Sequence, residues 1–238
     1  MNTKKRLKNL RILSPDYPRI RHLDKSISNM THDDIVLDHK IQFPIECWVQ
    51  EKVDGANCGV AWTSGPVLRN RSHILNKGYI EKETPAKLQF RSAWNWLHDH
   101  GKEIRSVSDM CHSPVTIYGE WLVAKHSIEY DRLPDWFVSY DIYSMEDRKF
   151  LSPDISEDIL SKTSIKFIKP YKVIFNNIDE VVEYSERPSD YRKGIREGIV
   201  IKLSDGKFVT ESFKVVNKYF VRRNDFNEAG LIKNRILA

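Results

Sequence analysis

The residues best suited to chemistry lie in the stretch EKVDGAN, residues 51–57. Lys52 is followed two residues later by Asp54 and then by Gly55, which places a primary amine, a carboxylate and a flexible turn close together. A lysine acts as a nucleophile only when it is uncharged, whereas a free lysine, with a pKa of about 10.4, is almost wholly protonated at neutral pH. Because Lys and Asp also flank many surface turns, this stretch needs support from elsewhere in the chain.

Four further segments supply that support, and they follow in a fixed order. They are LRNRSHIL (68–75), IYGEWLVAKHSIEYDRLPDWFVSYDIY (117–143), EGIVIK (197–202) and ESFKVV (211–216). Together with EKVDGAN they resemble the motifs of the covalent nucleotidyltransferase superfamily, which contains ATP-dependent DNA ligases, RNA ligases and mRNA capping enzymes. The segments resemble most the RNA ligases of the double-strand nick-sealing type, including bacteriophage and editing ligases. Asn57, where DNA ligases usually carry arginine, and YPRIRHL (17–23) share this resemblance.

The resemblance implies an ATP-dependent RNA ligase that joins a 5′-phosphate to a 3′-hydroxyl. Lys52 would form a covalent lysyl-AMP intermediate, AMP would move to the 5′ end of an RNA, and the neighbouring hydroxyl would displace it. The implied cofactors are ATP and Mg²⁺ (or Mn²⁺), and the implied partner is RNA with nicked or broken ends. Two alternatives stay open: a DNA ligase or capping-type nucleotidyltransferase, and a catalytically degenerate relative that binds RNA.

The same resemblance assigns a role to each remaining position. Lys202 and Lys214, with a bound metal, are expected to lower the pKa of Lys52 and to stabilise the departing pyrophosphate. Glu120 would contact the ribose, and Glu197 would support the metal. The other expected nucleotide-site residues are Glu51 at the adenine amino group, Asp54 and Gly55 in the turn, Asn57 near the RNA ends, Tyr140 against the adenine face or in the core, and Arg71 or Arg69 on a phosphate.

Two features depart from the family pattern. The last motif usually offers two basic residues separated by one, but here Ser212 stands at the first position and leaves Lys214 alone. Whether Lys218 or Lys207 compensates stays open. Only 24 residues follow Lys214, so we expect a single nucleotidyltransferase domain over 1–238, with 1–40 as an N-terminal extension and no separate C-terminal OB-fold.

The pattern of the chain predicts an α+β fold with mixed or mainly antiparallel sheets and flanking helices. Short runs rich in β-branched and aromatic residues predict strands, and two of them flank the DGA turn as a strand–turn–strand unit. The expected strands are 45–53, 57–62, 115–123, 136–143, 171–175, 198–203 and 207–216, the last two joined by a hairpin at Ser204-Asp205-Gly206. Helices are predicted over 84–100, capped by Thr84 and followed by Gly101, and after Ser152 and Asn177.

Length, composition and net charge limit the classes of protein to which the chain can belong. With 238 residues and 40% hydrophobic side chains, the chain can bury a sizeable core. The net charge of +5 favours a phosphate-bearing partner, and the basic residues of the first 13 positions are expected to form a solvated arm. Three cysteines give no disulfide framework, and no apolar run has the length of a bilayer span. We therefore expect a cytoplasmic protein without a membrane partner. The oligomeric state stays open, with a monomer favoured, and the resemblance adds a phage-encoded repair role.

Overall fold

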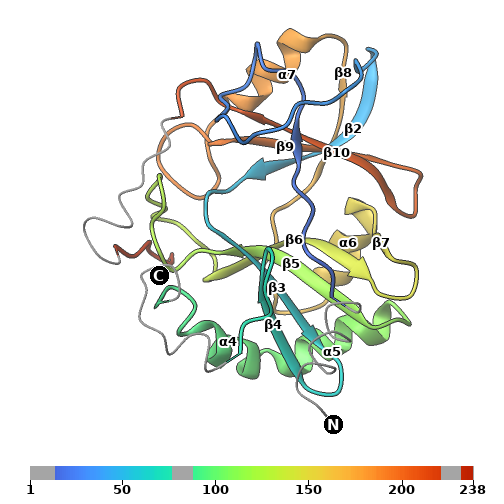
Figure 1. Ribbon diagram of the computed structural model, residues 1–238, viewed down its shortest axis with the longest axis vertical. Helices are drawn as coiled ribbons and strands as arrows, with labels where there is room; N and C mark the ends of the chain where they lie inside the picture. The colour runs from blue at the N-terminus through green and yellow to red at the C-terminus, as the bar shows by residue number, and fades with distance from the viewer. Residues whose placement is uncertain (1–13, 77–87, 221–231, 238) are drawn as a thin grey trace.

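Two five-stranded sheets form the body of the molecule, one above the other in Figure 1. The computed structural model describes residues 14–76, 88–220 and 232–237. Helices cover the outward faces of both sheets, and neighbouring strands are antiparallel apart from one short parallel pair. The predicted α+β fold class is therefore confirmed.

The upper sheet contains the predicted nucleophile. Its strand order is β1 (Arg21–His22), β10 (Val209–Val216), β9 (Gly198–Ser204), β2 (Ile45–Lys52) and β8 (Tyr171–Phe175). One face packs Val49, Ile201 and Val215 against helix α7 (Ile178–Ser185). Because successive side chains of a strand point to opposite faces, residues 50, 52, 200, 202 and 214 lie on the other face, toward the lower sheet.

The lower sheet carries the larger core. Its order is β4 (Pro66–Asn70), β3 (Ala56–Trp62), β5 (Val115–Trp121), β6 (Phe137–Ser144) and β7 (Lys149–Phe150). Three helices supply side chains to the same core, namely α4 (Ala93–Asp99), α5 (Gly101–Met110) and α6 (Pro153–Leu160). Strand β4 was not among the predicted strands, although it contains the first residues of the LRNRSHIL segment.

Both strands predicted around DGA exist, but the prediction that they pair with each other is wrong. Strand β2 pairs with β8 and β9, whereas β3 pairs with β4 and β5. Residues 53–55 instead carry the chain from one sheet to the other (Figure 1). A Cβ at Gly55 would lie 2.6 Å from Leu122 Cδ2, so the glycine permits close packing at this crossing. An Asp-Gly pair signals a turn locally, but the partners of the two strands are set by distant parts of the chain.

The helix predictions are mostly confirmed. Helix α6 begins at Pro153, and the Asn177 side chain caps α7 by accepting a hydrogen bond of 3.1 Å from the Glu180 backbone N–H. The predicted cap at Thr84 lies outside the described residues. Residues 89–92 form turns, so α4 spans only Ala93–Asp99 of the predicted helix 84–100. Gly101 does not end the helical region, because it is the first residue of α5. A Cβ at Gly101 would lie 2.4 Å from the Trp62 ring, so this glycine serves packing.

Residues 14–37, which we call the N-terminal segment, connect the two sheets on one side of the molecule (blue in Figure 1). At the lower sheet, Thr116 donates a 3.0 Å hydrogen bond to Ser14 Oγ. At the upper sheet, β1 adds to the edge of β10. The predicted solvated arm, residues 1–13, lies outside the described residues. All three cysteines are free thiols, as expected. In the described ranges no helix has the length and apolar character needed to cross a bilayer.

Candidate active site

A cleft of about 260 Å³ lies between the two sheets, and the N-terminal segment forms one of its walls. It contains most of the residues that the sequence singled out. The lining residues are Tyr17, Arg19, Ile20, Thr31, Asp33, Asp34, Gln50, Glu51, Lys52, Val53, Arg71, Glu120, Tyr140, Ile168, Val200, Lys202 and Lys214. Asn57 contacts Tyr140, which lines the cleft. Asp54 and Gly55 follow Lys52 at the crossing between the sheets, and Glu197 contacts Lys52.

The register of the strands in the upper sheet determines where the three cleft lysines lie. Lys52 lies opposite Gly198, Lys202 opposite Ser212, and Lys214 opposite Val200. Three amines from three neighbouring strands therefore reach the same cleft, although they are as much as 162 positions apart in the sequence. The alternation of strand side chains explains this convergence.

In the lower sheet, a β-bulge determines where Tyr140 lies. Tyr118 pairs with Asp141 and Gly119 with Ser139, so Tyr140 has no residue opposite it. Such a bulge redirects a side chain, and Tyr140 lines the cleft while Asp141 reaches toward Lys202. The register of β3 on β5 sets Asn57 opposite Glu120, and the Asn57 amide donates a hydrogen bond to the Tyr140 hydroxyl.

Carboxylates surround Lys52. Its amine donates a hydrogen bond of 2.6 Å to Glu197 Oε1, with the Lys52 side chain 20% exposed and that of Glu197 1% exposed. Burial alone would lower the pKa of Lys52, but Glu197 and Asp54, with Glu120, raise it above its ordinary value. In the protein without a bound metal, negative charge therefore outweighs burial around the amine, and the expected lowering of the Lys52 pKa by Lys202, Lys214 and a bound metal stays a prediction.

The other two lysines each have a carboxylate partner. Lys202 Nζ lies 2.6 Å from Asp141 Oδ1 and donates to Gln50 Oε1 at 2.6 Å, which places its charge deep in the cleft. Lys214 Nζ lies 3.0 Å from Asp34 Oδ1. Burial and the charge of Lys52 lower the pKa of Lys214, although Asp34 acts in the opposite direction.

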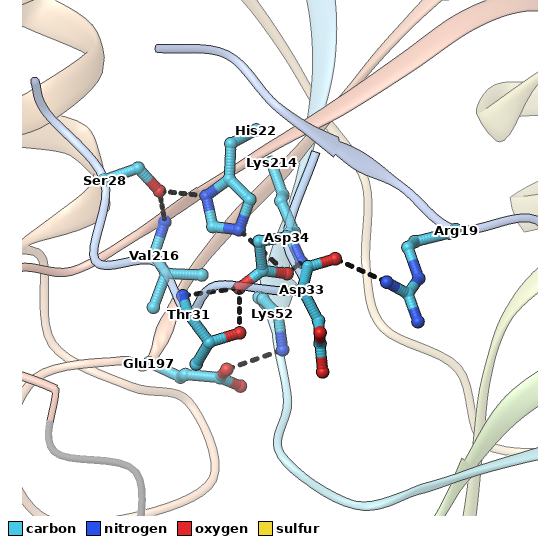
Figure 2. Close-up of polar contacts among 10 residues, drawn as sticks. All are labelled: Arg19, His22, Ser28, Thr31, Asp33, Asp34, Lys52, Glu197, Lys214 and Val216. Atoms are coloured by element: carbon cyan, nitrogen blue, oxygen red, sulfur yellow. Dashed lines mark hydrogen bonds and ion pairs between the residues drawn. The ribbon is translucent and has the colours of Figure 1, made fainter. Parts of the chain in front are cut away.

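The N-terminal segment organises the surroundings of Lys214 (Figure 2). Asp34 Oδ2 accepts hydrogen bonds of 3.0 Å from the Thr31 backbone N–H and hydroxyl. Despite burial, these bonds and Lys214 lower the pKa of Asp34. The fully buried His22 ring approaches Asp34 Oδ1 at 3.4 Å, and burial, with the charge of Lys214, lowers the His22 pKa to about 4. A neutral imidazole thus fills the space behind the ion pair.

Glu51 and Asp54, on either side of the nucleophile, bind loops. Both oxygens of the buried Glu51 accept hydrogen bonds, one from the Ser189 hydroxyl and one of 2.9 Å from the Asp190 backbone N–H. Burial raises the pKa of Glu51. Asp54 Oδ2 accepts a 2.7 Å hydrogen bond from the Ser127 backbone N–H. These contacts fix the strand end that presents Lys52.

The two arginines of LRNRSHIL differ in position. Arg69 is fully buried and donates to the Ser14 and Arg71 carbonyl oxygens and to the Asp16 carboxylate, so it anchors the N-terminal segment. Arg71 lines the cleft, which resolves the open choice of position in its favour. Neither proposed compensator of Ser212 lines the cleft: Lys207 lies 3.6 Å from Asp147, and Lys218 lies 3.9 Å from Glu186.

The chain matches the sequence profile of a known protein family. The sequence profile of the RNA ligase family matches residues 45–219, which is more than half of the chain. The chain belongs to the RNA ligase family. No match was found among curated proteins.

Solved structures similar to this RNA ligase family member include several of Naegleria gruberi RNA ligase. A variant solved with ATP and Mn gives a TM-score of 0.56 at 19% identity, and the ligase solved with PPi gives 0.55 at 20%. Each match covers 73% of this chain and 50% of that chain. At this identity the likeness shows the fold. The matched region is about half the length of those ligases.

Sequence reasoning missed part of the site of this family member. It assigned no role to Asp34, Arg19 or Gln50, although all three line the cleft. The YPRIRHL segment was noticed for its resemblance, and its position beside β10 explains its place in the cleft wall. No spacing rule predicts Asp34, because it lies 180 positions from Lys214.

Proposed function

We propose that this chain is an ATP-dependent RNA ligase that joins a 5′-phosphate to a 3′-hydroxyl through a Lys52–AMP intermediate. The observation that carries the proposal is the placement of Lys52 in the inter-sheet cleft, hydrogen-bonded to Glu197 and flanked by Lys202 and Lys214. Membership of the RNA ligase family and the fold shared with ligases solved with ATP, AMP and Mn support it.

The cleft suits a nucleotide. Val53, Ile168 and Val200 supply apolar surface beside the Tyr140 ring, which fits a purine base. Two buried polar atoms, Asn57 Oδ1 and Glu120 Oε2, have no hydrogen-bond partner among the described residues. Buried polar atoms are normally satisfied, so this pair indicates a polar ligand such as a ribose.

The proposed first step forms a P–N bond and breaks a P–O bond. Lys52 Nζ attacks the α-phosphorus of ATP, its proton passes to the Glu197 carboxylate 2.6 Å away, and pyrophosphate leaves. Lys214, on β10 and separated from the Lys52 strand by β9, would stabilise the negative charge that develops on the leaving group. AMP then moves to an RNA 5′-phosphate, and a 3′-hydroxyl displaces it.

The residues present also fit a divalent cation. In the part of the chain described, no cluster of three or more His, Cys, Asp or Glu side chains forms a ready-made metal site. Mg²⁺ commonly takes one or two carboxylates together with substrate phosphates, and Glu197 would support the cation or its bound waters. Bound Mg²⁺ or Mn²⁺ would add the positive charge needed to lower the pKa of Lys52.

Covalent labelling tests the function directly. Purified protein incubated with α-labelled ATP and Mg²⁺ should retain label after denaturation, and mild acid but not alkali should release it, because the bond is a phosphoramidate. Lys52→Ala should reduce labelling below detection, whereas Lys172→Ala, at a half-exposed position on β8, should label normally. Unlabelled wild type, or label that survives in Lys52→Ala, would reject the proposal.

A further inference from the structure

The cations that line the cleft fall into two groups. Lys52, Lys202 and Lys214 each lie within 3.0 Å of a carboxylate oxygen. Arg19 and Arg71, by contrast, make no ion pair with any carboxylate in the described ranges. Because a paired cation has part of its charge neutralised already, these two guanidinium groups are the cations most available to an anionic ligand.

Arg19 has a defined place at the mouth of the cleft (Figure 2). One of its terminal nitrogens donates to the backbone carbonyl of Asp33, which orients the exposed side chain. The backbone on both sides of it is held, because Tyr17 N–H donates to the Arg71 carbonyl at 3.3 Å and β1 pairs with β10 from Arg21 onward. The side chain is therefore supported by the N-terminal segment, and a guanidinium group has further N–H donors to offer.

The neighbouring strand supplies no second cation at this place. Ser212 lies with Arg19 in the hollow between the N-terminal segment and β10, and it carries no charge. Lys214 reaches the cleft from the same strand, but Asp34 lies against its amine. Arg71 lines the cleft but not this hollow, so beside β10 the cleft cation without an ion pair is Arg19, from the N-terminal segment.

We propose that Arg19 binds the β- and γ-phosphates of ATP at the mouth of the cleft. This inference rests on the proposed function, in which the α-phosphorus lies next to Lys52. A planar guanidinium group donates two parallel hydrogen bonds to a phosphate, which a lysine cannot reproduce. AMP lacks these two phosphates, so Arg19 contributes to the binding of ATP and not to that of AMP.

Titration of ATP and of AMP against the non-reactive Lys52→Ala protein, with Mg²⁺ in excess, tests this. Adding Arg19→Ala should raise the Kd for ATP about tenfold and leave the Kd for AMP within twofold. Adding Arg19→Lys should raise the Kd for ATP by a smaller factor, because lysine keeps the positive charge but cannot donate two parallel hydrogen bonds. The matched control is Arg21→Ala, because Arg21 lies two residues away, pairs with Asp38 and does not line the cleft.

The outcomes separate the possible roles of Arg19. Selective loss of ATP binding supports the proposal, and unchanged AMP binding shows that the variant is folded. An unchanged Kd for ATP, or equal weakening of ATP and AMP, overturns it. Covalent labelling of the wild-type protein is a separate experiment. If the proposed ligase function fails there, the Kd values for ATP and AMP can still be compared.

Discussion

At the scale of single residues, burial of Glu120 lowers the stability of the protein without ligand. Burial raises its pKa to about 8, although Lys52 and Arg71 both favour the charged form. Its Oε2 atom also has no hydrogen-bond partner among the described residues. A buried carboxylate of this kind destabilises the empty fold, and such costs are common where a binding site needs the group.

Replacement of Glu120 should therefore stabilise the protein in a pH-dependent manner. Above the unfolded-state pKa of about 4.5, the unfolded chain loses the proton that the folded chain keeps until about pH 8, so stability falls as pH rises through this window. Glu120→Gln should gain about 1–3 kcal/mol over wild type at pH 8.5, and much less at pH 5. Urea unfolding at both pH values measures the gain. An equal gain at both values would refute the pKa argument.

At the scale of elements, the register between β2, β9 and β10 fixes the nucleophile. Gly198 lies directly opposite Lys52, and a Cβ there would lie 2.1 Å from the Val215 backbone oxygen of β10. Strands β9 and β10 therefore approach closely here because this position lacks a side chain. Glu197, the hydrogen-bond partner of Lys52, immediately precedes this glycine.

Gly198→Ala should disturb both stability and the position of Lys52. The added methyl group meets backbone, which cannot move aside like the end of a flexible side chain, so we expect a loss of about 1–3 kcal/mol in the free energy of unfolding. The rate of covalent labelling should fall together with it. Urea unfolding with an unchanged m-value measures the first effect. Thr210→Ala, at an exposed position on β10, is the control, and wild-type stability of Gly198→Ala would contradict the packing argument.

At the scale of the whole molecule, each sheet has its own core, a third cluster joins the two, and the candidate cleft lies between them. The net charge of the chain is +5. The matched region spans about half the length of the solved ligases it resembles. The net positive charge would favour the proposed binding of RNA, because contacts between basic side chains and phosphates release counterions.

Binding of a 5′-phosphorylated RNA oligonucleotide should consequently weaken with salt. Each phosphate contact on a single strand contributes a slope of roughly −0.7 to the plot of log affinity against log salt concentration. Fluorescence anisotropy between about 50 and 200 mM salt, at constant Mg²⁺, measures this slope. An uncharged oligonucleotide analogue of the same sequence is the control. A flat plot would show that phosphate contacts do not drive the interaction.

The sequence by itself determined the local elements and the residues able to do chemistry. Short runs rich in β-branched and aromatic residues predicted β2, β9 and β10, and Asn177 predicted the start of α7, because these signals depend on neighbours along the chain. The spacing of Lys52, Asp54 and Gly55, with the ordered downstream segments, pointed to the family that the sequence profile confirms.

Only the tertiary structure decided which strands pair and which charges meet. The Asp-Gly turn after Lys52 joins two sheets instead of two paired strands, and Asp34 reaches Lys214 from 180 positions away. The pKa of Lys52 rises because Glu197, 145 positions distant, lies against its amine. Electrostatic energies depend on distance in space and on burial, and neither quantity can be read from local pattern.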